Sequence, residues 1–183
     1  EEVGRAIWAG DQTGLQALAE CYGSATEEQV KAKISAGCAR REELQHYSGG
    51  MFYYGQEWYW GVDRLYHLEK RLAELDVDGS PGKAMVVPRP PIEAGELKDN
   101  ASLTLEIYPS LRSPYTAIIF DRVVKLAADT GVNLLVRPVL PMVMRGVPAT
   151  RQKGMYIFQD AAREAREADI PYGNFYDPIG DPA

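Results

Sequence analysis

The stretch that decides the fold runs from Leu103 to Leu140 and reads LTLEIYPSLRSPYTAIIFDRVVKLAADTGVNLLVRPVL. Its first six residues alternate in the manner of a strand with one buried face. Ser113 suits the N-cap of a following helix and Pro114 its first residue, and Gly131 ends the helical pattern. Residues 132–140 are rich in β-branched side chains and predict a second strand. The stretch therefore predicts a βαβ unit with parallel strands and a right-handed crossover.

An aromatic hairpin is predicted in the first half of the chain. Residues 51–54 and 57–60 read as two strands, and the leading glycine of Gly55-Gln56 suits a type II′ turn. We expect the aromatic side chains to fill a core. After Gly61 a helix is expected to pack a leucine stripe on the hairpin. Its leucines recur at spacings of three and four, at Leu65, Leu68, Leu72 and Leu75.

Helical patterns flank these elements. The first runs from Val3 to Tyr22 with an interruption at residues 10–14, and Thr26 with Gln29 forms a capping box for the next helix. That helix is mostly charged, and its few apolar residues, from Val30 onward, are expected to face inward. In the second half residues 156–168 predict an amphipathic helix. The alternating charges of 163–167 are interpreted as its solvated face.

A linker is predicted at residues 77–101, where Asp, Gly, Pro and Lys replace the periodic apolar positions. Its centre, Val87-Pro88-Arg89-Pro90-Pro91, favours extended polyproline geometry. The linker should therefore act as a semi-rigid spacer between two structured halves.

Composition excludes several classes of function. The 183 residues are 45% hydrophobic and 25% charged, with a net charge of −6 and no basic run, so we expect neither nucleic acid nor a membrane as partner. Nothing resembles a signal peptide, which favours a cytoplasmic protein. Cys21 and Cys38 are separated by sixteen residues and match neither a redox pair nor a zinc framework. His46 and His67 lack ligand spacing, and no metal site is predicted.

Two sets of residues resemble the DsbA-like thioredoxin-fold family, in its branch of 2-hydroxychromene-2-carboxylate isomerases and kappa-class glutathione transferases. In the first half Trp60-Gly61-Val62-Asp63-Arg64-Leu65 matches the Gly-x-Asp-Arg signature that opens the family's last helix. The resemblance implies an α/β, thioredoxin-like fold (βαβ plus β-hairpin-α) with inserted helices. The matching positions of the second half are Ser113-Pro114-Tyr115, Arg137-Pro138, Lys153, Tyr156, Asp160, Arg163 and Ile170-Pro171.

The two sets stand in inverted order. Residues 1–76 resemble the C-terminal part of such a domain, with inserted helices, hairpin and last helix, whereas residues 102–183 resemble the N-terminal βαβ part of a second one. Two explanations stay open. The chain spans the junction of a tandem protein, which the pattern favours, or its halves combine in permuted order into one domain. A homo-oligomer, or pairing with the rest of a longer chain, would complete the fold in the first case.

The resemblance implies a glutathione-dependent isomerase or transferase that acts on a small, aromatic substrate. Ser113 takes the place of the nucleophilic cysteine and would stabilise the glutathione sulfur, as the positive end of a helix dipole also would. In the alternative interpretation the Ser113 hydroxyl only caps the helix. Dithiol exchange is set aside because Ser113 and Thr116 occupy both redox positions.

The resemblance also implies ligand-binding roles for residues other than Ser113. Pro114 and Tyr115 belong to the same segment as Ser113. Asp63 would contact the γ-glutamyl ammonium of glutathione, and Arg137 and Lys153 would hold carboxylates of glutathione or substrate.

Two positions depart from the family pattern. Gly49-Gly50-Met51 stands where members usually carry a cis-proline before the hairpin, and Val62 replaces a hydroxyl side chain of the kappa-class enzymes. The alternative function is therefore a catalytically silent thioredoxin-fold module that serves in assembly or protein binding.

Overall fold

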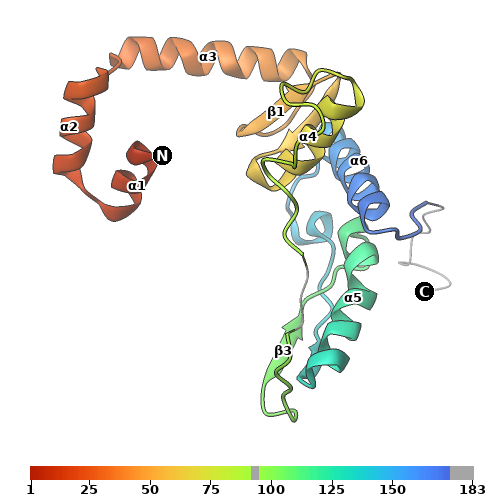
Figure 1. The fold of residues 1–183 in the computed structure, drawn as a ribbon. Helices are drawn as coiled ribbons and strands as arrows, with labels where there is room; N and C mark the ends of the chain where they lie inside the picture. Colours follow the sequence, from red (N-terminus) through yellow and green to blue (C-terminus); the bar gives the residue numbers. More distant parts are fainter. Residues whose placement is uncertain (92–94, 174–183) are drawn as a thin grey trace. The chain divides into compact units, whose positions relative to one another are not determined.

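Two compact units make up the chain in the computed structural model, which describes all residues except 92–94 and 174–183 (Figure 1). The first unit is Glu1–Gln45 and the second is His46–Ala183. The second unit holds both the hairpin and the βαβ stretch, and their assignment to parts of two DsbA-like domains stays a prediction. The excepted residues belong to the predicted linker and to the end of the predicted second domain, so those portions lie outside the described residues.

The first unit begins with two short helices, α1 (Glu2–Ala9) and α2 (Gln12–Tyr22). Gly10 ends α1 in the left-handed conformation, with φ of 65°. Asp11 then caps α2, because its carboxylate accepts a hydrogen bond of 2.8 Å from the Gly14 amide. The predicted interruption of the helical pattern is confirmed, but it is shorter than residues 10–14, because α2 already begins at Gln12.

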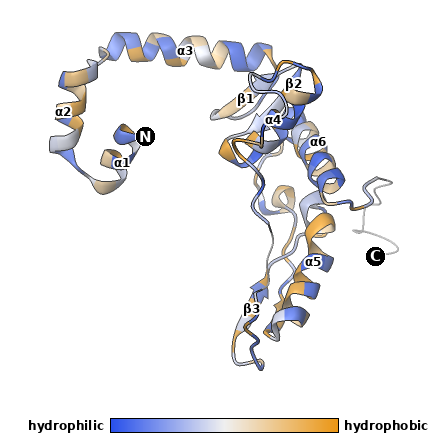
Figure 2. Cartoon of the chain, in the orientation of Figure 1, coloured by the Kyte–Doolittle hydropathy of each residue, from blue (hydrophilic) through white to orange (hydrophobic). Residues whose placement is uncertain are grey.

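The third helix of this unit, α3 (Glu27–Glu43), starts at the predicted capping box. The Gln29 amide donates to Thr26 Oγ1 at 3.2 Å, and the Thr26 amide donates to Gln29 Oε1 at 2.9 Å. The prediction that its apolar residues face inward is wrong, since Val30 and Ile34 are exposed. The helix is largely hydrophilic, and too few apolar residues line one side to form a buried stripe (Figure 2).

The second unit opens with the predicted hairpin. Strands β1 (Met51–Tyr54) and β2 (Glu57–Trp60) pair antiparallel. The turn differs from the predicted type II′, because Gly55 and Gln56 both have positive φ, at 56° and 66°. Positive φ at both central residues defines type I′, whose twist matches the strands that it joins.

The aromatic side chains of the hairpin divide between core and surface. Tyr59 is buried, whereas Phe52, Tyr53 and Trp60 are exposed. The prediction that they fill a core is therefore correct for only part of the set.

A 3-10 turn, η1 (Val62–Arg64), leads into α4 (Leu65–Glu74), which contacts β2. The predicted leucine stripe is not the buried face of this helix, since Leu75 is exposed and the other three leucines are half-buried. The buried residues are Tyr66 and His67. Both bond to α6, so the polar side of α4 is the side that is covered.

The predicted βαβ stretch forms β3 (Thr104–Ile107), α5 (Pro114–Thr130) and β4 (Asn133–Val136). The strands are parallel and β3 alternates exposed and half-buried residues, as predicted. Gly131 ends α5 with φ of 78°, beside the carbonyl oxygen of Asp99. The described residues thus form a mixed α/β structure with six α-helices and two separate two-stranded sheets.

The last helix, α6 (Arg151–Glu167), follows the 3-10 helix η2 (Met142–Arg145) and packs on α5. Thr150 caps it by accepting from the Lys153 amide at 3.2 Å, so the helix starts five residues before the predicted 156–168. It supplies much of the core of this unit. Its buried residues are Tyr156, Asp160, Ala161, Glu164 and Ala165.

The interpretation of residues 163–167 as a solvated face is wrong for Glu164. Its side chain is 9% exposed, and the Arg163 side chain is 15% exposed. Burial is possible here because Glu164 has basic partners on other elements, whereas Arg163 lies near the carboxylates of Asp160 and Glu57.

The predicted linker has no helix or strand in its described residues, but part of it is attached to the second unit. The amides of Val86 and Val87 donate to the Glu69 carboxylate at 2.5 and 2.9 Å. Arg89 donates to Glu164 Oε2 at 2.7 Å. This portion is therefore held against α4 and α6.

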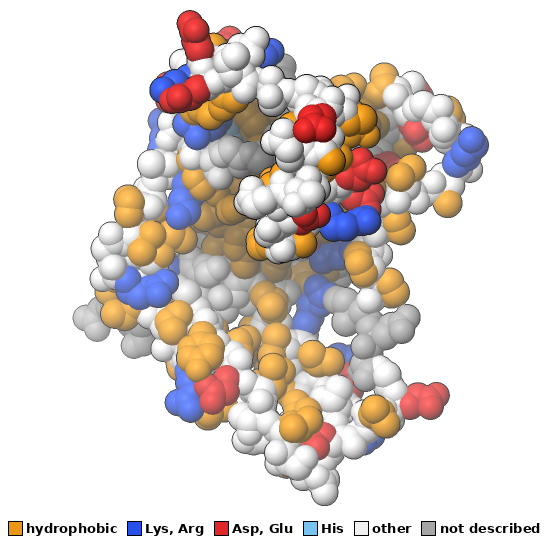
Figure 3. Space-filling model, turned by 90° about the vertical axis from the view of Figure 1, so that its left-hand side faces the viewer, with side chains coloured by type: hydrophobic (Ala, Val, Ile, Leu, Met, Phe, Trp, Pro, Cys, Tyr) orange, Lys and Arg blue, Asp and Glu red, His pale blue; other side chains and the backbone are white. Residues whose placement is uncertain are grey.

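Apolar side chains also remain on the surface, and many are visible on the face drawn in Figure 3. Leu103 and Tyr108, which flank β3, are both exposed. Each sheet has only two strands, so each also has unpaired edges.

Candidate functional site

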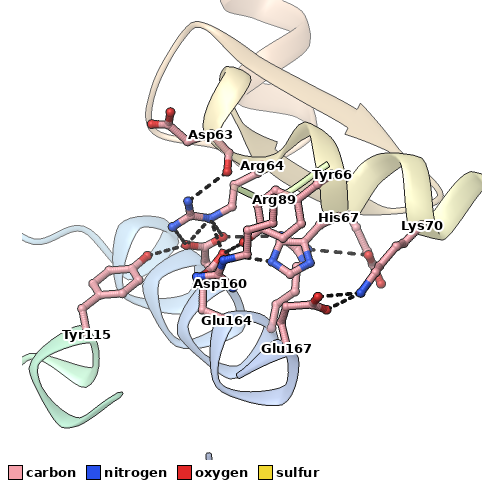
Figure 4. Close-up of polar contacts among 12 residues, drawn as sticks. Asp63, Arg64, Tyr66, His67, Lys70, Arg89, Tyr115, Asp160, Glu164 and Glu167 are labelled. Atoms are coloured by element: carbon pink, nitrogen blue, oxygen red, sulfur yellow. Dashed lines mark hydrogen bonds and ion pairs between the residues drawn. The ribbon is translucent and has the colours of Figure 1, made fainter. Parts of the chain in front are cut away.

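A ladder of contacts between basic and acidic side chains joins α4 and its preceding turn to α6 (Figure 4). We call these six residues the α4–α6 ladder. Each basic residue later in α4 contacts an acidic residue later in α6, so the two segments run in the same direction along the ladder. The outermost contact has Lys70 Nζ 2.5 Å from Glu167 Oε2. The basic side is Arg64, His67 and Lys70, and the acidic side is Asp160, Glu164 and Glu167.

Asp160 is the most heavily bonded member and is 0% exposed. Its carboxylate accepts from Arg64 Nε and Nη2 at 2.9 Å each, from the Tyr115 hydroxyl at 2.7 Å and from the Tyr156 hydroxyl at 3.2 Å. Arg163 Nη1 lies 3.5 Å away. Burial and the hydrogen bond to Asp160 raise the pKa of Tyr115, which keeps its phenol protonated.

Glu164 is a second buried carboxylate, one turn further along α6. It accepts from the Tyr66 hydroxyl, from His67 Nε2 at 3.0 Å and from Arg89 Nη2 at 2.7 Å, and Arg64 Nε lies 3.3 Å away. Burial alone raises the pKa of Glu164. The hydrogen bonds from His67 and Tyr66 and the charges of both arginines outweigh it and lower the pKa to about 2.

A pocket of about 290 Å³ lies beside Asp160 and is lined by Trp60, Asp63, Arg64 and Tyr115. Arg64 uses Nε and Nη2 on Asp160, and Nη1 donates to the Asp63 carbonyl oxygen at 3.2 Å. The Asp63 side chain is exposed and makes no hydrogen bond or ion pair with other described residues. The pocket thus combines a fixed cation, an open carboxylate and two aromatic rings.

A second pocket, of about 280 Å³, lies along the other end of the ladder. Its charged groups largely neutralise one another, as in the contact of Arg71 Nη1 with Glu74 at 3.3 Å. Most of its lining charges are thus engaged with one another.

No protein-family model, curated protein or solved structure matches the chain. What the site can do therefore follows from its own geometry and chemistry.

Two absences hold for residues 1–91 and 95–173, which the structure describes. In that part of the chain no three His, Cys, Asp or Glu side chains are grouped so that they could hold a metal ion. None of its helices combines the length and the apolar character that crossing a membrane requires.

The predicted site residues lie in different places. Asp63 and Tyr115, from the two separate motifs, line one pocket. Ser113 is the N-cap of α5, as predicted, and its hydroxyl makes no capping hydrogen bond, so the alternative role as a helix cap is not seen. Pro114 is the buried first residue of α5.

Arg137 and Lys153 do not line the pocket. Arg137 Nε instead donates to Glu106 Oε2 at 2.7 Å. Lys153 Nζ lies 5.9 Å from the centre of the Tyr47 ring, a cation–π contact. Their predicted ligand-binding roles stay predictions.

Sequence reasoning missed the ladder. In the sequence Arg64 and Asp160 stand out only as parts of motifs, and Glu164 is expected to lie in solvent. A signal was present, because the basic residues 64, 67 and 70 and the acidic residues 160, 164 and 167 each recur at helical spacing. Two such complementary stripes indicate two helices that face each other.

Proposed function

We propose that the chain is a DsbA-like thioredoxin-fold protein that acts as a glutathione-dependent isomerase or transferase on a small aromatic substrate. Ser113 takes the place of the redox cysteine in this proposal. The mixed α/β architecture is compatible with it. We also propose a cytoplasmic location, since Cys21 and Cys38 are both free and exposed, as suits a reducing compartment.

The observation that carries the proposal is the pocket that unites Asp63 with Tyr115. The γ-glutamyl end of glutathione presents an ammonium beside a carboxylate. The open Asp63 carboxylate can pair with the ammonium, and the guanidinium of Arg64 is a fixed cation beside it. The volume of about 290 Å³ is near the lower end of the range of about 300–1,000 Å³ for small-molecule pockets.

Ser113 supports the chemical part of the proposal. Its hydroxyl makes no capping bond, so it can donate to an anion at the first turn of α5, where free backbone amides also point. Glutathione, when bound, would supply a thiolate that adds reversibly to a conjugated substrate and leaves after bond rotation. The serine then lowers the energy of the thiolate without exchanging a proton.

A silent module for assembly or protein binding is the second candidate. The exposed apolar residues and the unpaired edges of both sheets favour it, because such edges can pair with another chain. A thermal midpoint that rises with protein concentration, in a protein that does not bind glutathione, would support this candidate.

Calorimetric titration with glutathione tests the enzyme proposal. We expect saturable binding at millimolar glutathione or below, and at least ~10-fold weaker binding for Ser113→Ala and Asp63→Asn, since each removes one contact to a charged group. Ser110→Ala is the matched control on the same loop and should bind normally. No heat and no thermal shift at millimolar glutathione would rule out the proposal. Unchanged binding by Ser113→Ala would remove the role of Ser113.

A further inference from the structure

Two of the residues that line the pocket beside Asp160 come from elements far apart in the sequence, and both contact α6. Arg64 comes from η1 and Tyr115 from the first turn of α5. Both donate to the same carboxylate, at 2.9 and 2.7 Å. Asp160 itself is 0% exposed and does not line the pocket, so it cannot touch a ligand there.

We propose that Asp160 is a positioning residue that fixes Arg64 and Tyr115 and thereby sets the affinity of the pocket for its ligand. The choice of ligand rests on the proposed function. The positioning role of Asp160 does not rest on the proposed function, because it concerns contacts within the chain.

The chemistry of the contacts explains why a carboxylate is needed at this position. An ionised Asp160 is an acceptor only, and its two oxygens receive donors from Arg64, Tyr115 and Tyr156. Asparagine would keep the shape but replace one oxygen with an NH₂ group. In either orientation that group would face an N–H of Arg64, so the guanidinium would lose at least one of its hydrogen bonds to residue 160.

Positioning and charge have opposite effects on an anionic ligand. Removal of a buried negative charge beside the pocket, by itself, strengthens the attraction of Arg64 for a carboxylate. Loss of the fixed geometry of Arg64 and Tyr115 weakens binding, because poorly held groups must be ordered when the ligand binds. The sign of the affinity change therefore separates the two roles.

The central variant is Asp160→Asn, with Asp129→Asn as matched control. Asp129 carries the same side chain on α5, but that side chain is 43% exposed and pairs with Lys125 at 2.5 Å. For Asp160→Asn we expect glutathione binding to weaken ~10-fold or more. The control should bind as the wild type does.

A second readout needs no ligand. In protein labelled with ¹³C at the tyrosine Cζ, the Tyr115 signal is identified as the one lost in Tyr115→Phe. In the wild type this signal should resist titration to high pH, because burial and the bond to Asp160 raise the pKa of the phenol. In Asp160→Asn it should titrate at lower pH, while Asp129→Asn leaves it unchanged.

Tyr156→Phe provides a second test of the positioning role, which remains available if Asp160→Asn does not fold. It removes one donor to Asp160 at 3.2 Å without changing a residue that lines the pocket. We expect a folded protein with a disturbed Tyr115 signal and glutathione binding weakened ~3-fold or more.

The outcomes separate the two proposals. A wild type that does not bind glutathione contradicts the proposed function, and the Tyr115 signal still decides the positioning role. Equal or tighter binding by a folded Asp160→Asn protein, or a Tyr115 titration unchanged in both Asp160→Asn and Tyr156→Phe, would overturn the role of Asp160.

Discussion

Glu164 shows how a single buried charge is tolerated in this chain. A carboxylate removed from water costs several kcal/mol unless charged and hydrogen-bonding partners compensate it. Here the compensation comes from His67 and Tyr66 on α4, from Arg64 before that helix and from Arg89 of the linker. The contribution of Glu164 to stability should therefore depend on its ionisation.

The first prediction concerns pH. The folded-state pKa of Glu164 is about 2, below the ordinary value of about 4.3, so the unfolded state binds more protons between these values. The stabilisation, about 3 kcal/mol, is complete above pH ~4.3 and is lost as the pH falls towards 2. Urea unfolding at several pH values should show this slope in the wild type.

Glu164→Gln should flatten the acid slope and should destabilise the protein by ~3 kcal/mol or more at pH 7, because its cationic partners stay buried. Glu74→Gln, on the exposed end of α4, is the control. An acid slope that is the same in Glu164→Gln and the wild type would contradict the role of Glu164.

At the scale of elements, the end of α5 depends on one glycine. Gly131 has φ of 78°, and a Cβ atom there would lie 2.1 Å from the backbone oxygen of Asp99. Both the left-handed conformation and the contact exclude a side chain. The amides of Asp99 and Ala101 donate to the carbonyls of Thr130 and Gly131, so the chain cannot easily move away.

The second prediction compares two glycine substitutions. Gly131→Ala should lower the free energy of unfolding by ~2 kcal/mol or more, through clash and strain. Gly154→Ala lies within α6, with nothing within 4 Å of the added Cβ, and should stabilise by about 0.5–1 kcal/mol. Chemical denaturation measures both. A tolerated Gly131→Ala would contradict the close contact.

Local sequence signals predicted most of these elements. The hairpin strands and the βαβ order follow from period-two patterns and turn residues, which need no distant partner. The turn type was wrong because Gln56 takes a positive φ that is uncommon outside glycine. The buried side of α4 was wrong because its cover, α6, lies almost a hundred residues later in the chain, and no local pattern shows it.

The candidate site was predictable to a similar extent. Asp63 and Tyr115 came from the family resemblance, and one pocket contains both. The roles of Arg64 and Asp160 depend on the contact between them, and the two residues are 96 positions apart in the sequence. A charged residue read alone is normally expected in solvent, and only a structure shows that it is paired and buried.

At the scale of the whole chain, two segments of the second unit recognise each other through the α4–α6 ladder. One segment carries the hairpin and α4, and the other carries α5 and α6. Residues 79–84 between them are exposed and irregular, so the backbone there can be cut without loss of a strand or helix.

The third prediction uses a specific protease site placed in residues 79–84. After cleavage the two pieces should elute together at micromolar concentration, because the buried contacts of the ladder remain, as do the bonds from the Val86 and Val87 amides to Glu69. High salt should weaken the association of the two pieces only modestly, since buried ion pairs are poorly screened. Pieces that separate at low salt would favour a chain whose halves belong to two different domains.

The long separation of Arg64 from Asp160 also matters while the protein is being synthesised. A ribosome that adds about 5–20 residues per second takes roughly 5 to 20 s to travel the 96 residues between them. During that interval the nascent hairpin and α4 present a basic stripe with no acidic partner. Asp160 cannot hold Arg64 and Tyr115 in place until α6 has emerged, so full ligand affinity would report on completed synthesis of both segments.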